Sequence, residues 1–569
     1  MLQIEKQTII AVTPYEAKDA VKSVPAGRWV PSRKCWSFPA TPLVADRLIK
    51  AIGDYGVDPL VADLASSGVY VDDIIARIND GEVVKVSDRM RHEPRSNQVI
   101  GALMMREMSG GILGWGMGAG KTYAALSMIA DIVDKAVADA KQGILAKIII
   151  ICPATVVFNV WPKEIKKHLI DSHEYLEVSA MPKGTSTDRR VRDAERKLEY
   201  AEKAGRGFVF IIGTESVWRS NVDEFVHRHD WDTAIIDEIH KVETPGAKIT
   251  RWVDTVLTKR SARRWGLTGT LFRKDELDAF CPVRFVEPGI FGRSAQKFRD
   301  QYAIIDWFGR PDGPKDPEAI RKEIGRVVHF VKTRDVVDFP ACTEIDVFFD
   351  MSPAEMKQYK SMENDSILEV EEGTLTASNG LARLLRLQQI TSGFVPVKDE
   401  DGNDRGVQVG TSKRDALEEW MSGIDDDEPI VVFTMFKSDV RNAVEACTNL
   451  GRKTYQLNGS ADELDAWQQC NEPSVLVANI RSAGVGVDFT RACYGIFFSY
   501  GYSHPDYDQA LRRLDRPGQT TPTILARLVA NKTIDTVIAS SLDDRGSGIE
   551  AAITYLKDQY GTLGKKLKK

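Results

Sequence analysis

Short apolar runs alternate with amphipathic stretches along most of the chain, and this pattern predicts its main elements. Runs rich in Ile and Val are typical of strands that are buried on both faces of a parallel sheet. In the first half they occupy residues 147–151, 208–212 and 234–236. In the second half they occupy 429–433, 474–478 and 494–498. Because helical stretches separate the runs, we predict an α/β chain with two parallel-sheet lobes and helical insertions.

Changes in the pattern divide the chain into segments. Residues 1–52 predict a small α+β unit with a helix from Pro14 to Val24, a hairpin containing Cys35 to Phe38, and a helix from Leu43 to Ile52. We predict the remaining segments as a polar connection (53–88), lobe one (89–285), a linker (286–345), a helical insertion of lobe two (346–410), lobe two (411–545), and a C-terminal helix with a basic tail (546–569).

Composition narrows the class of protein. Apolar residues make up 43% of the 569 residues, which is enough for several buried cores, and the net charge is −6. That charge argues against a protein that coats nucleic acid, but a motor needs only one basic track. The seven cysteines form no Cys-x-x-Cys pair. No apolar run approaches the ~20 residues of a membrane span, and the N-terminus does not resemble a secretory signal. We expect no membrane association and a cytoplasmic location, in a nucleoid or a host cytoplasm.

The strongest chemical pattern is a glycine-rich loop before a predicted helix. Such a loop points backbone N–H groups at phosphates, and the helix dipole adds to the attraction. Lys121 is placed to reach the β- and γ-phosphates, and Thr122 to bind Mg²⁺. A purely structural turn is the alternative. The predicted ATP-binding residues are Gly116, Met117, Gly118, Ala119, Gly120, Lys121 and Thr122.

Two acidic residues follow the apolar run 234–236. We assign Asp237 to the metal and Glu238 to the attacking water. An acidic pair that ends a strand is usually a solvated loop, but this pair follows a phosphate loop within one predicted sheet. Together the two patterns indicate ATP hydrolysis with Mg²⁺.

Arg513 and Arg516 are spaced three apart in the second half of the chain. On a helix this spacing would place both guanidinium groups on one face, where they could clamp a γ-phosphate from the other lobe. An ordinary basic helix face is the alternative. With Lys121 and Glu238, the two arginines complete the predicted catalytic set.

The order of these patterns resembles the Swi/Snf helicase-like family of helicase superfamily two, over about residues 90–540. The matching segments are 115–122, 151–155 with Trp161, 214–216, Asp237-Glu238-Ile239-His240, 266–270, 457–460, 482–488 and 509–519, which ends in the family's Arg-x-Gly-Gln. The resemblance implies two RecA-like lobes. It implies ATP contacts by Gln98, Gly486 and Gln509, and DNA contacts by Pro153, Thr155, Thr214 and Ser482.

The chain departs from the family pattern at three places. Trp115 and Gly116 stand where the family has an acidic pair, so the outer contacts of the loop are open. Leu271 replaces the proline that follows Thr-Gly-Thr. Gln98 is the candidate for reading adenine, but its spacing from Pro94 differs from the family pattern, and a surface glutamine is the alternative.

The N-terminal unit resembles, more weakly, the small DNA-binding module of annealing helicases. Arg28 can meet phosphates, and Trp29 or Trp36 can stack on an unpaired base. Alternatively both tryptophans fill the space between the hairpin and its helices.

These patterns predict an ATP-dependent DNA motor, a translocase that acts on duplex or branched DNA in replication, repair or recombination. ATP and Mg²⁺ are the expected cofactors, and DNA, held mainly by its backbone, is the expected partner. Two alternatives stay open: a helicase that separates strands of DNA or RNA, and a non-catalytic clamp that ATP switches between states.

Overall fold

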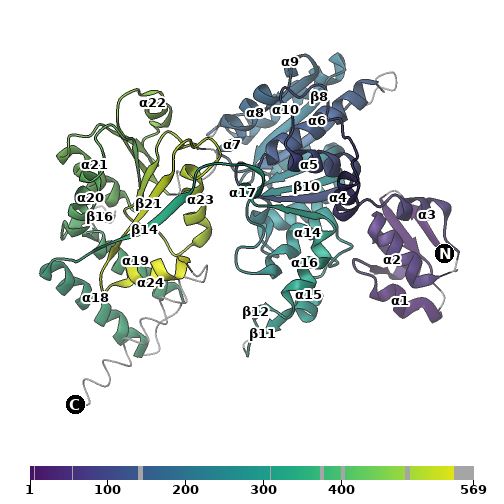
Figure 1. Ribbon diagram of the computed structural model, residues 1–569. Coiled ribbons are helices and arrows are strands. Elements are labelled where there is room, and N and C mark those ends of the chain that lie inside the picture. Colours follow the sequence, from purple (N-terminus) through teal and green to yellow (C-terminus); the bar gives the residue numbers. More distant parts are fainter. Residues whose placement is uncertain are drawn as a thin grey trace. The chain divides into compact units, whose positions relative to one another are not determined.

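Two parallel β-sheets organise the chain (Figure 1). The computed structural model describes residues 1–543 apart from Lys6, Pro14, 54–55, 139–144, Lys183, Phe308, 372–376, 399–403 and 481–486. It contains two units, Met1–Val337 and Asp338–Lys569, each built on one of the sheets. The predicted α/β class with two parallel-sheet lobes is confirmed. The predicted C-terminal helix and tail, 546–569, lie outside the described residues.

The N-terminal module is a four-stranded antiparallel sheet covered by helices. Its strand order is β1-β2-β4-β3, with β1 at Leu2–Glu5, β2 at Thr8–Ala11, β3 at Arg28–Val30 and β4 at Cys35–Pro39. The helices α1 (Lys18–Ser23) and α2 (Pro42–Ile52) pack on it, around a core that includes Ile9, Phe38 and Leu48. The predicted helix-hairpin-helix lacked β1 and β2, because four-residue strands are too short to display a period.

The segment 53–88 is more ordered than the predicted polar connection. It contains α3 (Pro59–Ser66) and α4 (Val71–Asn79). Asp58 caps α3 by accepting from Leu60 N at 2.9 Å, and Val61 belongs to the same core as α2. The module therefore extends into α3.

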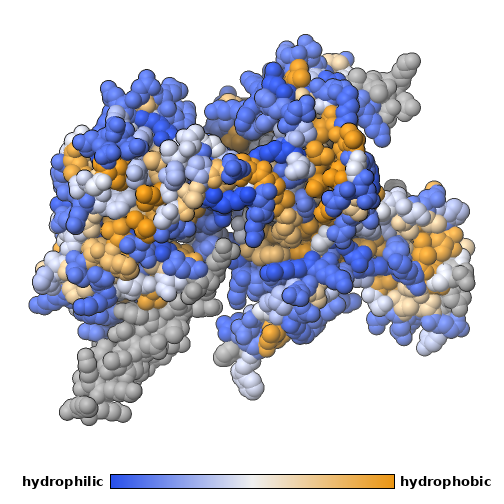
Figure 2. Space-filling view, viewed as in Figure 1, coloured by the Kyte–Doolittle hydropathy of each residue, from blue (hydrophilic) through white to orange (hydrophobic). Residues whose placement is uncertain are grey.

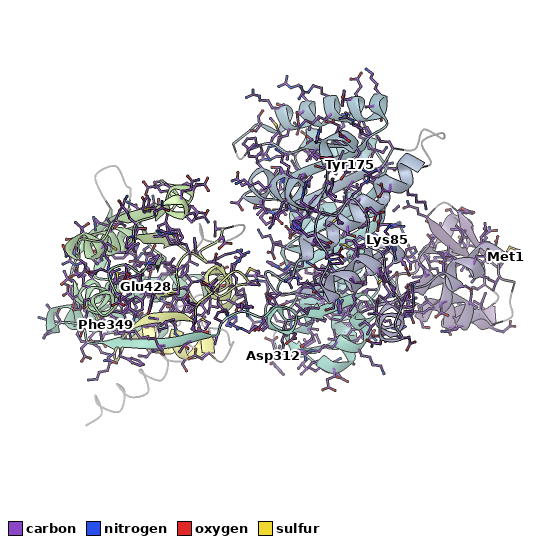
Figure 3. All side chains as sticks on the ribbon, turned by 45° about the horizontal axis from the view of Figure 1, so that its top comes forward. Met1, Lys85, Tyr175, Asp312, Phe349 and Glu428 are labelled. Carbon is purple, nitrogen blue, oxygen red and sulfur yellow. The ribbon has the colours of Figure 1, made fainter. Side chains whose placement is uncertain are left out.

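Hydrogen bonds join the module to the rest of the first unit. Thr41 Oγ1 donates to Glu287 Oε1 at 2.8 Å, and Arg47 reaches Gly289 O at 2.5 Å and Glu323 Oε2 at 3.0 Å. Glu287 is almost completely buried, and burial raises its carboxyl pKa. Removing residues 1–52 would therefore leave the buried Glu287 carboxyl group without the hydrogen bond from Thr41, which is destabilising. Figure 3 labels Met1 on the outer side of this module.

The first parallel sheet has the order β13-β5-β10-β9-β6-β8-β7. Its strands confirm the predicted runs, which are buried on both faces. β13 comes from the predicted linker 286–345 and pairs in parallel with β5, so that segment belongs in part to the first lobe. The strands are β5 (Gly110–Trp115), β6 (Lys147–Cys152), β7 (Leu176–Ser179), β8 (Gly207–Gly213), β9 (Trp231–Asp237), β10 (Ser261–Thr268) and β13 (Val328–Val331).

Helices cover this sheet, and their apolar sides face it. In α10 (Thr187–Ala204) the buried positions Val191, Ala194 and Leu198 form one stripe, while charged residues form the polar surface in Figure 2. A hairpin of β11 (Ala303–Ile305) and β12 (Pro311–Pro314), which contains the labelled Asp312, follows α15 (Figures 1 and 3). The other main helices are α5 (Ser96–Glu107), α6 (Lys121–Ala138), α8 (Trp161–His168), α11 (Ser220–Arg228), α14 (Phe280–Val286), α15 (Ala295–Tyr302), α16 (Pro317–Gly325) and α17 (Thr333–Val336).

The second parallel sheet has the order β14-β21-β20-β17-β19-β18. The predicted helical insertion is part of its core, because Tyr359 on α18 and Leu384 and Leu387 on α19 pack with sheet residues. The strands are β14 (Cys342–Phe349), β17 (Ile430–Thr434), β18 (Thr454–Leu457), β19 (Val475–Asn479), β20 (Tyr494–Phe497) and β21 (Thr523–Ala530). The helices include α18 (Pro353–Glu371), α19 (Ala377–Thr391), α20 (Ser412–Ser422), α21 (Lys437–Asn449), α22 (Leu464–Gln469), α23 (His504–Leu514) and α24 (Ile534–Asp543), beside a hairpin of β15 (Phe394–Lys398) and β16 (Asp404–Gln408).

Among the described residues, no helix is both long enough and apolar enough to cross a membrane.

Candidate nucleotide site

The glycine-rich loop lies between the carboxyl end of β5 and the start of α6. Gly118 (φ 79°) and Gly120 (φ 91°) adopt the left-handed backbone that L side chains avoid. Lys121 begins the helix, and its ammonium donates to Trp115 O at 2.8 Å and Gly116 O at 3.3 Å. Thr122 follows in the first turn. The loop, the helix N-terminus and the lysine thus meet where phosphates would bind.

Residues at the start of α5 contact the loop. Arg95 Nη2 donates to Gly118 O at 3.2 Å, and Asn97 Nδ2 donates to Ala119 O at 2.8 Å. Gln98 is buried, and its Oε1 caps α5 by accepting from Arg95 N at 2.8 Å. A Cβ on Gly120 would lie 2.0 Å from Gln98 Nε2. The predicted adenine-reading glutamine therefore lies against the phosphate loop, and its contact with adenine stays a prediction.

The acidic pair ends β9, as predicted. Asp237 Oδ2 accepts from Trp161 Nε1 at 3.2 Å, and Asp237 Oδ1 accepts from the backbone N of Glu238 at 3.1 Å. Burial and the neighbouring charge of Glu238 raise the pKa of Asp237 to about 6, although the charge of Lys121 acts in the opposite direction. Asp237 is therefore close enough to both Lys121 and Glu238 to interact with them electrostatically.

Glu238 occupies a backbone conformation that is unusual for a residue with a side chain. Its φ of 56° and ψ of 52° lie in the left-handed region. Its Oε2 lies 3.3 Å from His240 Nδ1, which in turn lies 3.0 Å from Thr268 Oγ1. Thr268 Oγ1 also accepts from Thr270 N at 3.1 Å. A polar chain thus links the end of β9 to the end of β10, and strain at Glu238 is typical of functional sites.

Trp115 fills a position where the resemblance had left the contacts open. Its indole is fully buried and donates from Nε1 to His329 Nδ1 on β13 at 3.2 Å. The ring reaches α5, where a Cβ on Gly101 would lie 2.4 Å from it. A buried aromatic ring and a histidine therefore pack at the base of the loop.

His329 should make the first unit sensitive to acid. Burial lowers the pKa of His329 to about 4, from an ordinary 6.5. Between these pH values the unfolded chain binds more protons than the folded chain, so the folded state loses stability as pH falls. Replacing His329 by glutamine keeps an acceptor for Trp115 but removes the titration. We expect thermal melting of the wild type to decline more steeply from pH 7 to pH 4.5 than that of His329→Gln. Parallel declines would contradict the assignment.

Three of the predicted DNA contacts lie together at the carboxyl ends of β6 and β8. These strands are neighbours, with Cys152 opposite Gly213, and Thr214 N donates to Cys152 O at 2.9 Å. Pro153 and Thr214 are buried, whereas Thr155 is exposed. The structure brings these segments together, and their contact with DNA stays a prediction.

In the second unit, the prediction that Arg513 and Arg516 share a helix face is wrong. α23 ends at Leu514, and Arg516 lies beyond it, because Pro517 disfavours helical backbone in the residue before it. Arg513 is buried. Arg516 Nη1 donates to Val487 O at 3.2 Å and lies 3.7 Å from Asp488.

Of the other predicted residues in the second unit, the structure describes some and not others. Gln509 is half-buried on α23. Gln519, which ends the family-like motif, donates from Nε2 to Ala492 O at 2.6 Å and Leu514 O at 3.0 Å, so it holds the chain after α23 in place. Ser482 and Gly486 lie outside the described residues.

The two tryptophans of the N-terminal module differ in environment. Trp29 is 44% exposed, and Arg28 beside it is exposed. Trp36 is half-buried and packs edge-on against Trp29 with 5.5 Å between ring centroids. Arg33, also on this surface, pairs with Glu5 at 2.6 Å. Trp36 is therefore placed for packing, and Trp29 for an external contact.

Several site residues had no signal of their own in the sequence. Arg95 and Asn97 precede their partners in the loop by 23 and 22 residues. These partners are backbone carbonyls, which no sequence motif reveals. His240 and Trp161 stood in family-like segments, but their hydrogen bonds to Thr268 and Asp237 join separate strands and helices.

The SNF2-related domain matches residues 75–392, which is more than half of the chain. The chain belongs to the SNF2-related family. The Swi/Snf resemblance is therefore confirmed. An ATP-dependent helicase of Mycoplasma genitalium, described as uncharacterized, is 23% identical over 439 residues, which cover 75% of this SNF2-related chain and 38% of that protein.

Two yeast relatives carry names that refer to DNA. The DNA repair and recombination protein RDH54 of Saccharomyces cerevisiae is 24% identical over 75% of this chain and 50% of its own length. The DNA repair protein rhp54 of Schizosaccharomyces pombe is 25% identical over 74% of this chain and 52% of its own. The SNF2-related chain thus spans about half the length of these relatives or less.

Solved structures also match. The Sulfolobus solfataricus SWI2/SNF2 ATPase core in complex with dsDNA is 21% identical, covers 81% of this chain and 93% of its own, and has a TM-score of 0.39. The SWI2/SNF2 ATPase core domain of the same organism has a TM-score of 0.36 over 81% of this chain and 90% of its own.

Proposed function

We propose that this chain is an ATP-driven motor that moves along duplex or branched DNA. The observation that carries the proposal is the convergence of the glycine-rich loop, Lys121 and the acidic pair at the carboxyl edge of one sheet, in a chain of the SNF2-related family. The names of RDH54 and rhp54 favour DNA over RNA. We expect the protein to work in the compartment that holds its DNA, a nucleoid or a host cytoplasm.

The residues present fit ATP with Mg²⁺. The loop N–H groups and the N-terminus of α6 suit phosphate oxygens, and Lys121 is placed to move from the loop carbonyls to the phosphates. Thr122 and Asp237 would hold the metal. Burial of the Asp237 carboxyl disfavours its negative charge, and a divalent cation would restore it. When bound, Mg²⁺ neutralises charge on the phosphates.

Glu238 would orient and polarise the attacking water. Its backbone conformation fixes where the side chain begins, and His240 and Thr268 support its carboxylate through their polar chain. Such positioning is the main contribution of a protein to phosphoryl transfer. Arg513 and Arg516 of the second unit would complete the site by stabilising charge on the γ-phosphate.

DNA would bind mainly through its phosphates. Thr155 is exposed beside the buried Thr214 at one edge of the first sheet, and Ser482 stays a predicted DNA contact of the second unit. Phosphate contacts carry no sequence information and are weakened by salt. We therefore expect binding that depends strongly on salt and weakly on sequence.

The proposal is tested by measuring steady-state ATP turnover with no nucleic acid and with single-stranded DNA, duplex DNA, forked DNA or RNA. We expect duplex or forked DNA to raise turnover most. Stimulation by RNA alone would overturn the DNA assignment. Hydrolysis limited to a single turnover would favour an ATP-switched clamp, and directional release of a displaced strand would favour a strand-separating helicase.

The N-terminal module should contribute to binding of forked DNA through Trp29. Its exposed ring can stack on an unpaired base, which is worth ~1–3 kcal/mol, while Arg28 meets phosphate. We expect Trp29→Ala to weaken binding of forked DNA more than binding of plain duplex, with an unchanged melting temperature. Fluorescence anisotropy at two salt concentrations measures both affinities.

Trp307→Ala is the matched control, because Trp307 is 96% exposed on the turn between β11 and β12 of the same unit. Equal losses on both ligands would mean that Trp29 belongs to a general DNA-binding surface. No loss on either ligand would remove the module from the DNA-binding proposal.

A further inference from the structure

The end of the first unit runs along the phosphate loop. β13 pairs in parallel with β5, so that Val331 lies opposite Trp115, the last residue before the loop. The pairing continues into the loop, because Gly116 N donates to Val331 O at 2.8 Å. After β13 the chain forms α17 and reaches Val337, the last residue of the unit. The segment that leads to the second unit is therefore in direct contact with the loop.

Thr333, the first residue of α17, makes the closest contact. Its side chain is buried, and its Oγ1 donates to Met117 O at 2.7 Å. A Cβ on Gly116 would lie only 2.2 Å from the same Oγ1 and 3.0 Å from Thr333 N. The glycine at 116 thus permits a close approach of the segment to the loop, and the hydroxyl group uses that approach to hold a loop carbonyl.

Holding a carbonyl also orients the neighbouring amide. In a trans peptide the C=O and the following N–H point in opposite directions, and the described chain contains only trans peptides. When Thr333 holds the carbonyl of Met117, the N–H of Gly118 therefore points away from Thr333. Arg95 and Asn97 hold the next two carbonyls, those of Gly118 and Ala119, in the same manner.

Three successive carbonyls are therefore fixed by three side chains from outside the loop. The amides of Gly118 and Gly120 are thereby directed away from the side chains that hold the preceding carbonyls, as a phosphate-binding loop requires, whereas Ala119 N donates to Gly116 O at 3.2 Å within the loop. Two of the three side chains belong to the start of α5. The third, Thr333, belongs to the segment that continues into the second unit.

We infer that Thr333 is a positioning residue that holds the phosphate loop in its phosphate-accepting conformation and joins it to the segment between the two units. The inference rests on the proposed function, since it assumes that the loop binds a nucleotide. A displacement of this segment would pull on Met117 O and alter the orientation of the Gly118 amide. Nucleotide affinity and the position of the segment are thus coupled, and anything that moves the segment, such as DNA binding, changes nucleotide affinity.

The test uses the full chain and a fluorescent ADP, so that binding is measured without hydrolysis. Thr333→Val keeps the shape of the side chain but removes the hydroxyl group, and Thr333→Ser keeps the hydroxyl group. Thr250→Val is the control, because Thr250 is equally buried and donates to a backbone carbonyl, Val242 O, far from the loop in sequence. ADP affinity is measured with and without duplex DNA, together with KM and kcat for ATP.

We expect Thr333→Val to weaken ADP binding and raise KM roughly 2- to 10-fold with a nearly unchanged kcat, as the loss of one hydrogen bond to the loop predicts. Thr333→Ser and Thr250→Val should bind as the wild type does. The ratio of ADP affinities with and without DNA should move toward one in Thr333→Val only.

Three results would overturn the inference: wild-type affinity in Thr333→Val, equal losses in Thr333→Ser and Thr333→Val, or an unchanged DNA-dependent ratio in Thr333→Val. Failure of the proposed function gives a different result, because the wild-type chain itself would then either not bind ADP or show an ADP affinity that duplex DNA does not change.

Discussion

Replacing Glu238 by glutamine is expected to lower kcat for ATP hydrolysis at least ~10²-fold while nucleotide affinity stays near that of the wild type. The amide keeps the size of the side chain and its place beside His240, but it no longer attracts a proton from the attacking water. Because Glu238 would touch water rather than the phosphates, binding should persist. The residue already lies in the left-handed backbone region, and the substitution leaves that backbone unchanged.

Glu243→Gln is the matched control. Glu243 lies just beyond the short helix Ile239–Val242 that follows Glu238, is similarly enclosed and pairs with Arg273 at 2.9 Å. Turnover and fluorescent-nucleotide affinity are measured for both variants and the wild type. Near-normal turnover in Glu238→Gln would remove Glu238 from the catalytic set. Equal losses in both variants would point to disturbed folding of this segment.

Replacing Arg516 by alanine is expected to reduce the rate of hydrolysis by as much as ~10³-fold, with a much smaller change in ATP affinity. Arg516 follows α23 in a turn, and in this position its guanidinium is held by Val487 O and lies near Asp488. A guanidinium that approaches the γ-phosphate only in the transition state contributes to kcat and little to binding. Single-turnover rates at saturating ATP, together with equilibrium affinity, separate these two effects.

Arg512→Ala provides the comparison, because Arg512 is also half-buried and pairs with Asp508 on the same helix at 2.8 Å. It should keep most of the wild-type rate. A loss of ATP affinity in Arg516→Ala with an unchanged rate at saturation would make Arg516 a ground-state ligand. Wild-type behaviour in both variants would exclude an arginine-finger role for Arg516.

The sequence predicted the elements whose pattern is long or chemically distinctive. Buried strands such as β6 and β9 were visible as apolar runs, and the loop and acidic pair were visible because phosphate and metal chemistry restricts the residues that can serve. Short strands such as β1 and β13 were not, since four residues are too few to distinguish a strand from a loop. Pairing with another strand, β2 for β1 and the distant β5 for β13, determines their structure.

The same distinction applies to the site. Lys121 and Asp237 were assigned from their motifs, whereas Arg95, Asn97 and Thr333 act through backbone carbonyls and come from separate parts of the chain. The prediction that Arg513 and Arg516 share a helix face was wrong for a different reason. Their spacing was read with a helical period, although the proline at 517 ends the helix before the second arginine.

Trp115 stands where the family pattern has an acidic residue, and its packing at the base of the loop limits which substitutions this chain can accept. Trp115 fits only because Gly101 has no side chain, and its indole N–H donates to His329. An acidic residue at 115, as in the wider family, would leave a void beside Gly101 and a buried imidazole without its indole donor. Conversely, any side chain at 101 would clash with the tryptophan. Positions 101 and 115 are therefore epistatic, because a side chain at 101 is acceptable only after Trp115 has been replaced by a smaller residue. A lineage that acquired Trp115 would thus be expected to retain it, because each single step of reversal passes through a less stable intermediate.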